Sequence, residues 1–404
     1  MSSSGQRDRE PVRGPLRILA LGHEASRSGA PLIHLGWLRW AARRPERFKV
    51  HSVLIRGGAL LAEWPQLSSV TLLSRMVSHC GPYRRLFLKF LDRPYFLRSR
   101  FRRLWTTLSS EGVDVVLVNS QAAGCMVPVL GRNHPPVVLH SHELAGYSNR
   151  FVHPADRRYL REHVAVWIAV SEAGGRHVID NWAVAGSKVK VIRNFVLPVP
   201  GLDCDRFELR RQLAVEHGLP GDRVWVLAVG GLDPVKGPEV FIEVASEMAT
   251  VCPGSVLCIW IGGGVDGPYG RALLRLPGAS NVCFLGARTD VGRWLAAADM
   301  MLLSSIEESS SLAVLEAAQL GTPVIAFRGT GGPDEMLDDG GGQLVPDRTG
   351  AAMAQAVRRW LDHPQERASV AAVARERVRK EADYERQCEK IAGVLESVVR
   401  EPTT

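Results

Sequence analysis

Short apolar runs alternate with helix-forming segments along most of this sequence. The runs are apolar on both faces, as strands of a parallel sheet must be when helices cover both of its sides. We therefore expect strands at 16–21, 50–55, 113–119, 137–140, 166–170, 225–229, 256–261, 282–285, 300–304 and 324–327. The repeated β-α-β order predicts an α/β fold with two doubly wound domains.

A domain boundary is expected at 194–205, where NFVLPVPGLDCD carries prolines and a glycine between a strand-like and a helix-like segment. The chain has 404 residues, too many for one ordinary core. We expect a disordered leader at 1–14, a first domain at 15–198 and a second at 199–380. Residues 381–404 are helical in composition and are expected to pack back toward the first domain.

The composition is that of a globular protein, because 46% of the residues are hydrophobic and 23% are charged. No apolar run reaches the ~18 residues that a membrane-spanning helix needs. The N-terminus lacks the apolar segment of a secretory signal. The 7 cysteines form no Cys-x-x-Cys pair, so free thiols in a reducing cytoplasm are expected.

The net charge of +8 is concentrated in residues 84–105, RRLFLKFLDRPYFLRSRFRRLW, which Pro94 divides into two pieces. Two interpretations remain open. The pieces are amphipathic helices that bury Leu and Phe in the core and solvate the arginines, or they form a surface for a membrane or an anionic acceptor. The second interpretation predicts peripheral contact at the inner face of the membrane. No nucleic-acid-binding fingerprint accompanies the stretch.

The segment EESSSLAVLEAAQLG, residues 307–321, predicts a site for a phosphate group. Its serines are good N-cap residues, and a helix starting near Ser311 would end at Gly321. The free N–H groups and the dipole at such a helix start bind phosphate. Glu308 lies before that start and Glu316 inside the helix, which suits hydrogen bonding to sugar hydroxyls. The alternative is a capped surface helix with two solvated glutamates.

Two loops of the first half follow predicted strands, and ligands of such sheets bind where the strands end. Gly29 and Ala30 follow the first strand, and their small size lets the backbone approach an anion or a sugar. The loop lacks the G-x-G-x-x-G dinucleotide fingerprint. His142 and Glu143 follow another strand, where they suit hydroxyl orientation or proton transfer. A surface loop with hydrogen-bonded histidines is the alternative.

Loops of the second half carry further candidates. Gly230 and Gly231 end a strand, and Lys236 then precedes a helix, which places its charge beside a bound phosphate. The turn that ends at Arg288 offers backbone groups and a guanidinium to a nucleobase. The D-x-D of residues 203–205 falls in the expected linker, so we expect no metal site.

Together these segments resemble the GT-B-fold glycosyltransferases of family 4, over about residues 16–361. The most specific elements are the E-x7-E of Glu308 and Glu316 within ESSSLAVLEAAQLGTPVIA, and the segment GGLDPVKG. WIAVSEAGGRHVI, KVKVIRNFV and NVCFLGARTDVGRWLAAADMMLL also match, in the same order as in the family.

The resemblance implies two Rossmann-like domains that face each other across a cleft. It also implies a metal-independent, retaining transfer of a hexose-type sugar from a nucleoside diphosphate donor to a hydroxyl acceptor, with no other cofactor. A natural-product aglycone, an aminocyclitol or a lipid-linked saccharide would be the acceptor. By similarity, Glu316 would bind the donor ribose, Glu308 the transferred sugar, and Lys236 the leaving diphosphate. The other implied site residues are His142, Gly29, Ala30, Gly230, Gly231, Arg288, Ser310, Ser311 and Leu312.

The sequence departs from the pattern of the family in two places. The family usually has an arginine where this chain has Gly231, so we expect either that Arg27 or Arg288 supplies a compensating cation or that catalysis is weaker. The family often has Gly-Phe-Gly at the place where residues 309–311 of this chain are Ser-Ser-Ser. The serines keep the backbone amides and add hydroxyl groups near the donor sugar.

Two further classes of function stay open. One is another nucleotide-sugar enzyme on the same fold, such as an epimerase or a hydrolase. The other is a non-catalytic protein that binds a nucleotide sugar, which the glycine at position 231 would favour.

Overall fold

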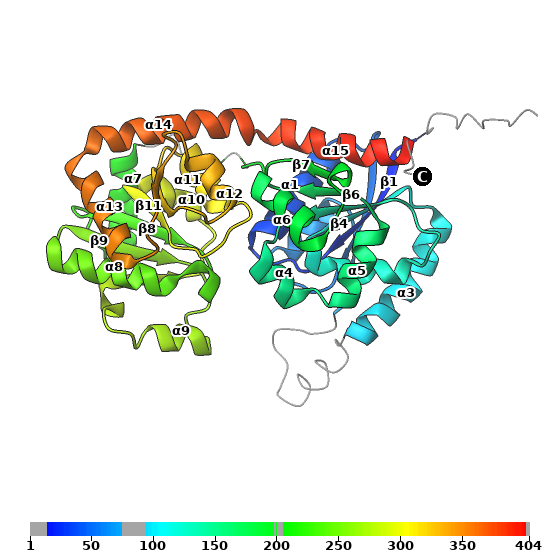
Figure 1. Cartoon of the computed structure of the whole chain (residues 1–404), viewed down its shortest axis with the longest axis horizontal. Helices are drawn as coiled ribbons and strands as arrows, with labels where there is room; N and C mark the ends of the chain where they lie inside the picture. Colours follow the sequence, from blue (N-terminus) through cyan, green and yellow to red (C-terminus); the bar gives the residue numbers. More distant parts are fainter. Residues whose placement is uncertain (1–13, 75–93, 198, 200–204, 401–404) are drawn as a thin grey trace, which may run out of the picture.

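The computed structural model describes residues 14–74, 94–197, 199 and 205–400, which form two α/β domains side by side (Figure 1). The first domain has a seven-stranded sheet of order β3-β2-β1-β4-β5-β6-β7, and the second a six-stranded sheet of order β10-β9-β8-β11-β12-β13. The pairs in both sheets are parallel. This doubly wound arrangement confirms the predicted fold class.

The first domain follows the predicted alternation of strands and helices. Its elements are β1 Leu16–Gly22, α1 Gly29–Ala42, β2 Phe48–Leu54, η1 Leu61–Gln66, β3 Ser69–Leu72, α3 Pro94–Glu111, β4 Val115–Asn119, η2 Gln121–Leu130, β5 Val137–Ser141, α4 Ala145–Phe151, α5 Pro154–His163, β6 Val164–Ala169, α6 Glu172–Trp182, η3 Gly186–Lys188 and β7 Val189–Val191. Strands β1, β4, β5 and β6 form its buried centre.

The second domain has the same alternation of strands and helices. Its elements are α7 Arg206–His217, β8 Val224–Val229, η4 Pro234–Lys236, α8 Pro238–Val251, β9 Val256–Ile261, α9 Pro268–Leu273, η5 Ala279–Asn281, β10 Val282–Gly286, α10 Val291–Ala297, β11 Met300–Leu303, α11 Leu312–Gln319, β12 Val324–Phe327, α12 Gly332–Leu337, β13 Gln343–Val345, α13 Gly350–Asp362 and α14 Pro364–Glu381. A final helix, α15 Tyr384–Arg400, follows.

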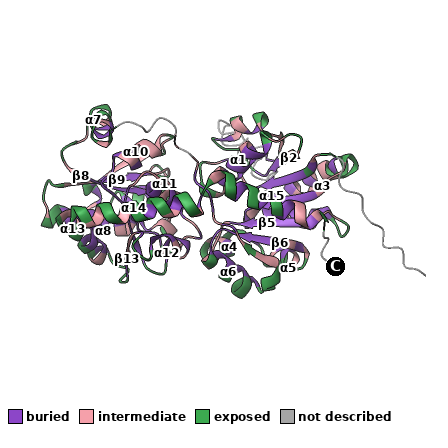
Figure 2. Cartoon of the chain, turned by 90° about the horizontal axis from the view of Figure 1, so that it is seen from above, coloured by how far each residue is buried: buried purple, intermediate pink, exposed green. Residues whose placement is uncertain are grey.

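Each sheet is covered on both faces, so its strands lie inside the domain (Figure 2). In the first domain α1 and α15 cover one face, and α3, η2 and α6 contribute to the core on the other. In the second domain α8 and α13 cover one face, while α7, α10, α11 and α14 cover the other. Burial on both faces explains why alternating polar positions are missing from the central strands.

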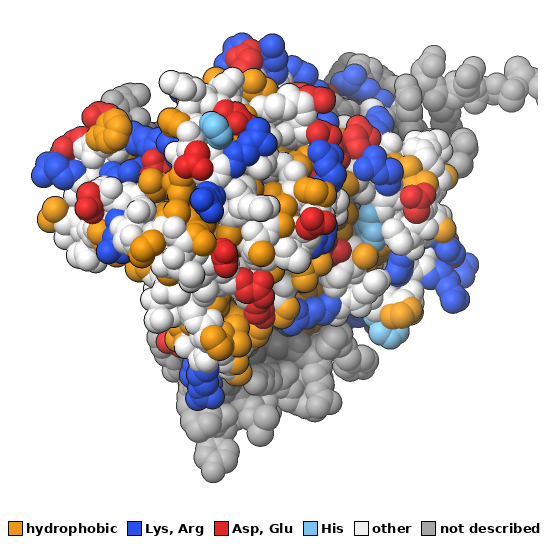
Figure 3. All heavy atoms as spheres, turned by 60° about the vertical axis from the view of Figure 1, so that its left-hand side comes forward, with side chains coloured by type: hydrophobic (Ala, Val, Ile, Leu, Met, Phe, Trp, Pro, Cys, Tyr) orange, Lys and Arg blue, Asp and Glu red, His pale blue; other side chains and the backbone are white. Residues whose placement is uncertain are grey.

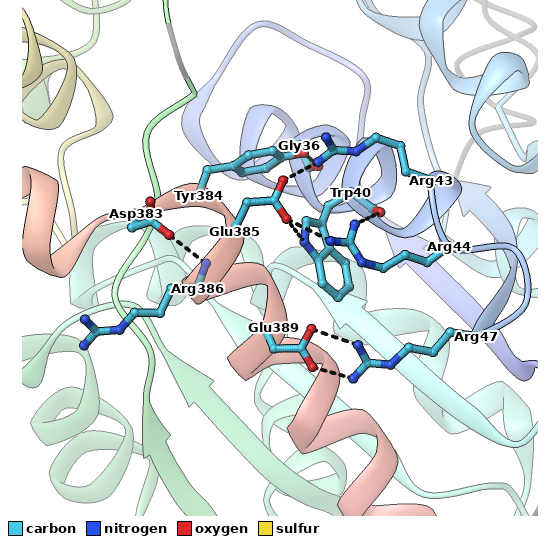
Figure 4. Close-up of polar contacts among 10 residues, drawn as sticks. All are labelled: Gly36, Trp40, Arg43, Arg44, Arg47, Asp383, Tyr384, Glu385, Arg386 and Glu389. Carbon is cyan, nitrogen blue, oxygen red and sulfur yellow. Dashed lines mark hydrogen bonds and ion pairs between the residues drawn. The ribbon is translucent and has the colours of Figure 1, made fainter.

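Helices α14 and α15 run across the top of both domains in Figure 1. The apolar residues Cys388, Ile391, Ala392 and Leu395 of α15 follow the spacing of one helical face and are buried in the core of the first domain. Figure 4 shows the polar side of this contact, where Glu385 faces Trp40, Arg43 and Arg44.

The basic stretch at 84–105 is described only from Pro94 onward, and residues 84–93 lie outside the described part of the chain. Helix α3 buries Leu97 and Phe101 and exposes Arg102 and Arg103. The described half therefore has the features of an amphipathic helix on the core. On the face shown in Figure 3, basic and acidic side chains are intermixed.

No helix among the described residues is long and apolar enough to cross a membrane. The described cysteines, Cys125, Cys252, Cys258, Cys283 and Cys388, are free thiols. Residues 1–13 of the predicted leader and most of the D-x-D at 203–205 lie outside the described residues. Asp205 itself caps α7 by accepting a hydrogen bond of 3.3 Å from the amide of Phe207.

Candidate active site

The candidate site lies where the carboxyl ends of the two sheets meet. The order of each sheet reverses between β1 and β4 and between β8 and β11, and ligands of open α/β sheets bind outside such points. Contacts join the two domains there: Glu307 accepts a 2.7 Å hydrogen bond from the amide of Gly146, and Arg150 lies 3.3 Å from Asp233. A small pocket is lined by Ser171 and Asn194 of the first domain and by Ser310 and Ser311 of the second.

Helix α11 begins at Leu312 and points its first turn into this region. Ser311 occupies the N-cap, but its side chain makes no capping hydrogen bond. The hydroxyl of Ser309 is buried and has no partner among the described residues. The first N–H groups of any helix lack intrahelical acceptors. The predicted amides of Ser310, Ser311 and Leu312 are therefore free to bind an anion.

Glu308 and Lys236 form an ion pair just before this helix. The Lys236 Nζ lies 2.5 Å from the Glu308 Oε1, and the Ser305 hydroxyl donates to the same oxygen at 2.9 Å. Burial alone would lower the pKa of Lys236, but the Glu308 carboxylate raises it above its usual value. Lys236 is therefore a cation at neutral pH, held beside the N-terminus of α11.

Backbone geometry at Gly237 fixes the position of Lys236. Gly237 has φ +62°, a left-handed conformation that favours glycine. A Cβ atom there would also clash with the Ser304 carbonyl oxygen at the end of β11. The Ser304 hydroxyl in turn donates a 2.9 Å hydrogen bond to the Lys236 carbonyl. The Lys236 loop and the loop after β11 thus pack directly against each other.

Glu316 lies one turn inside α11 and is half-buried. Burial raises the pKa of its carboxyl group to about 7, and the positive charge of Arg27 from the first domain opposes this rise. Its carboxylate makes no hydrogen bond or ion pair with the described residues. A half-buried carboxyl group without a partner is suited to receive hydroxyl groups of a ligand.

Gly230 and Gly231 follow β8 and differ in their surroundings. The Gly230 carbonyl accepts a 2.8 Å hydrogen bond from the Trp260 indole, and a Cβ at Gly262 would clash with it. Gly231 is exposed, and a Cβ there would meet only the Gly263 carbonyl oxygen, at 3.8 Å. The structure therefore has room for a side chain at position 231.

Two arginines were expected to supply the positive charge that is missing at Gly231. They differ in whether another residue already binds their guanidinium group. The Arg288 guanidinium forms two hydrogen bonds to Asp290, of 2.7 and 3.0 Å, and lies over the Trp294 ring. It follows β10, an edge strand that β9 separates from β8. Arg27 is exposed, has no ion pair with any described residue, and is close enough to Glu316 to influence its pKa.

The first domain contributes His142 and the first turn of α1. The His142 Nε2 lies 3.0 Å from the Asn119 Oδ1, and the Asn119 Nδ2 donates to the Ala30 carbonyl at 3.0 Å. Burial holds the pKa of His142 well below its usual value, with smaller effects from the neighbouring imidazoles. His142 is therefore neutral. Gly29 has no atom near its Cβ position.

Glu143 has a structural role that its sequence position did not indicate. Its carboxylate accepts hydrogen bonds from the Ser120 hydroxyl, the Gln121 amide at 3.0 Å and the His142 amide at 3.1 Å. Ser120 has φ +87°, which is uncommon for a serine. Glu143 thus braces the loops after β4 and β5 and is not free to act as a base.

Sequence reasoning missed Asn119, which completes the His142 side of the site. The signal that would have indicated it is its place: a polar residue that ends the apolar run VVLV, next to the first strand. Among the described residues, no group of three or more His, Cys, Asp or Glu side chains is arranged to hold a metal ion.

Two sequence models of protein families match this chain. Residues 60–198 match the family described as Glycosyltransferase Family 4, and residues 223–363 match Glycosyl transferases group 1. Curated relatives include a D-inositol 3-phosphate glycosyltransferase of Kineococcus radiotolerans, 31% identical over 52% of this chain and 52% of the relative. A D-inositol 3-phosphate glycosyltransferase 2 of Catenulispora acidiphila is 33% identical over 41% and 42%. The chain thus matches about half the length of these relatives or less.

Solved structures share the whole fold at low identity. The Anabaena protein HepE in complex with UDP and glucose has a TM-score of 0.73 and 22% identity, over 95% of this chain and 100% of that one. Sucrose-phosphate synthase from Thermosynechococcus elongatus has a TM-score of 0.71 and 19% identity, over 96% and 99%.

Proposed function

Because this chain belongs to the glycosyltransferases of family 4 and has their GT-B fold, we propose that it transfers a hexose-type sugar from a nucleoside diphosphate donor to a hydroxyl acceptor. The transfer retains the configuration at the anomeric carbon and needs no metal ion. The cytoplasm is its proposed location, and contact of residues 84–105 with a membrane stays a prediction.

The observation that carries this proposal is the group of charges around the start of α11. Lys236 and the free amides of α11 supply positive charge at one point, where a leaving diphosphate gains negative charge. The Lys236–Glu308 pair keeps one carboxylate beside that point for the hydroxyls of the sugar. Glu316, without a described partner, is available for the ribose.

We propose a uridine nucleotide as the donor and a cyclitol as the acceptor. The first choice is supported by HepE, whose structures contain UDP, UDP-glucose and glucose. The second is supported by the curated relatives, which are named D-inositol 3-phosphate glycosyltransferases. A lipid-linked saccharide is the other acceptor class to be tested.

The test begins with binding of UDP-, GDP-, ADP- and TDP-sugars, measured by thermal shift and calorimetry in the presence of a chelator. A nucleotide that binds only the folded state raises the melting temperature. A clear shift with one nucleotide and no shift with the others supports the donor site and identifies its base. If none of the four nucleotide sugars binds, the proposal is contradicted.

Product analysis then separates the classes of function. Transfer to inositol phosphates or other cyclitols, with an α-linked product from an α-linked donor, supports a retaining transferase. Release of free sugar without acceptor indicates a hydrolase, and a changed donor sugar indicates an epimerase. Binding without any product indicates a non-catalytic protein.

A matched pair of variants tests the role of Lys236. Lys236→Met should lower kcat by roughly 100-fold or more, as expected when one charged group at a developing anion is lost. Lys49→Met removes an exposed lysine of β2 and should leave kcat unchanged. Equal activity of Lys236→Met and the parent would remove Lys236 from the proposed mechanism.

A further inference from the structure

Asn119 connects two parts of the first-domain wall of the cleft. It is buried at the end of β4, and the sheet register places it opposite Gly22 of β1 and His140 of β5. From there its side-chain amide reaches both the Ala30 carbonyl in α1 and the His142 ring, each at 3.0 Å.

The hydrogen-bonding capacity of these groups fixes the position of one proton. A carbonyl oxygen only accepts hydrogen bonds, so the amide nitrogen of Asn119 must face Ala30. Its amide oxygen must then face His142, and this oxygen also only accepts. The His142 Nε2 therefore carries the proton of this hydrogen bond.

The other nitrogen of His142 is left with a lone pair. A neutral imidazole has one N–H, which Nε2 already carries. The ring is neutral because burial, with the imidazoles of His140, His23 and His34 nearby, lowers the pKa of His142. No described residue donates a hydrogen bond to Nδ1. His142 is only half-buried, which leaves this nitrogen to a ligand.

We propose that Asn119 is a positioning residue that holds His142 as its Nε2–H tautomer, so that Nδ1 accepts a hydrogen bond from a sugar hydroxyl in the cleft. The identity of the ligand rests on the proposed function, whereas the tautomer does not. His142 then selects a hydroxyl group and does not donate a proton to the reaction from Nδ1. A sugar that lacks this hydroxyl cannot form the hydrogen bond to Nδ1.

The resting protein tests the tautomer directly. Nitrogen NMR of protein with ¹⁵N-labelled histidine, with the His142 signals assigned by their loss in His142→Ala, distinguishes a protonated from an unprotonated ring nitrogen. We expect Nε2 to be protonated and Nδ1 unprotonated in the parent protein near neutral pH. Asn119→Leu, of similar volume, should abolish this preference. A protonated Nδ1 in the parent, or an unchanged tautomer in Asn119→Leu, would overturn the proposal.

Asn119→Asp separates the two contacts of Asn119. A carboxylate still accepts from Nε2–H but cannot donate to the Ala30 carbonyl. We expect the NMR signature of the Nε2–H tautomer to persist in this variant. Its loss there would show that the contact with α1, rather than the acceptor, orients the ring, and would overturn the proposal.

Kinetics tests the consequence for the reaction. Asn119→Leu should lower kcat/KM by about tenfold, the effect of one lost hydrogen bond. Calorimetry should show unchanged nucleotide binding, because Lys236 and Glu316, which are proposed to bind the nucleotide, lie in the second domain. In a His142→Ala background the same substitution should add no further loss. An equal loss in both backgrounds means that Asn119 acts through the fold and overturns the proposal. If the parent transfers no sugar but shows the expected tautomer, the proposed function fails and the assignment of the proton stands.

Discussion

At the scale of the residue, the two glutamates of the E-x7-E motif are in different electrostatic states. The Glu308 carboxylate forms an ion pair with Lys236. Glu316 has no described partner, and burial raises its pKa to about 7. Near neutral pH the carboxyl group of Glu316 is therefore partly protonated before a ligand binds.

This raised pKa predicts that donor binding depends on pH. Hydroxyl groups of the ribose donate to an ionised carboxylate, so binding requires deprotonated Glu316 and strengthens as the pH rises through about 7. Below this value the Kd of an uncleaved nucleotide sugar should increase by up to about tenfold per pH unit. Calorimetry between about pH 6 and pH 8 measures the effect. In Glu316→Gln the pH dependence should disappear, and a parent Kd that stays constant would contradict the assignment.

The open space at Gly231 leads to a second prediction. Gly231→Arg restores the residue that the family usually has there and meets no steric obstacle at its Cβ. The added guanidinium should bind the diphosphate and lower the Kd of the nucleotide sugar by about tenfold, the effect of one hydrogen bond to a charged group. Val215→Arg, at an exposed position of α7, is the control for net charge. Equal binding by both variants and the parent would show that position 231 does not face the phosphates.

At the scale of the element, α15 is held to the first domain by an apolar face and by its carboxylates. The Glu385 Oε2 accepts a 2.7 Å hydrogen bond from the buried Trp40 indole, and its other oxygen lies 2.6 Å from Arg43. Arg47 bridges Glu389 at 2.8 Å and Glu396 at 2.7 Å. The contacts of Glu385 and Glu389 with α1 and the segment after it are drawn in Figure 4.

We expect Glu385→Ala to lower the free energy of unfolding of the first domain by about 1–3 kcal/mol, chiefly because the buried Trp40 N–H loses its acceptor. The matched variant Glu376→Ala removes a carboxylate of similar exposure whose ion pairs, within the described part of the chain, are with Arg379 and Lys380 of its own helix. Such exposed pairs contribute little, so this substitution should leave the free energy of unfolding nearly unchanged. Urea unfolding followed by tryptophan fluorescence compares the two. Equal effects would mean that α15 docks through its apolar face alone.

At the scale of the whole molecule, the second domain also reaches across to the first through Glu335 of α12. The Glu335 carboxylate accepts from the amides of Glu172 at 3.1 Å and Ala173 at 2.8 Å, and lies 2.6 Å from Arg193. A carboxylate from one domain thus caps α6 of the other, where the helix dipole favours negative charge. The two domains are joined at the cleft as well as through their covalent links.

Buried neutral histidines make the stability of the molecule depend on pH. Burial lowers the pKa of His34 and His140 to about 3. Above about pH 6.5 these imidazoles are neutral in both the folded and the unfolded state. Below it the unfolded chain alone takes up protons, so the free energy of unfolding falls with pH by up to ~1.4 kcal/mol per unit for each imidazole.

His34→Phe tests this dependence, because phenylalanine keeps an aromatic ring beside Trp64 and has no proton to bind. The loss of stability between about pH 7.5 and pH 5.5 should be smaller in the variant than in the parent, by roughly 1–2 kcal/mol. Urea unfolding at both pH values measures the difference. Identical pH dependence in the two proteins would mean that His34 is protonated in the folded state.

The sequence by itself determined the features that depend on neighbouring residues, such as the central strands and the start of a helix. The central strands, such as β9 and β12, were predicted to the residue because their apolar runs are bounded by polar, proline or glycine residues. The start of α11 and the spacing of Glu308 and Glu316 were also predicted, since capping and helical period depend on neighbouring residues. The edge strands β3 and β13 were missed, because four and three residues are too few to show a period.

Only the tertiary structure decided which of these residues meet. Lys236 and Glu308 are 72 positions apart, and Asn119 is 89 from Ala30, so no local period relates them. The sequence also left Arg288 free to bind a ligand, whereas the structure pairs it with Asp290. Which charge lies beside which depends on how the parallel strands are ordered and how the two domains close. These long-range pairings are set by burial of the sheets and not by any pattern along the chain.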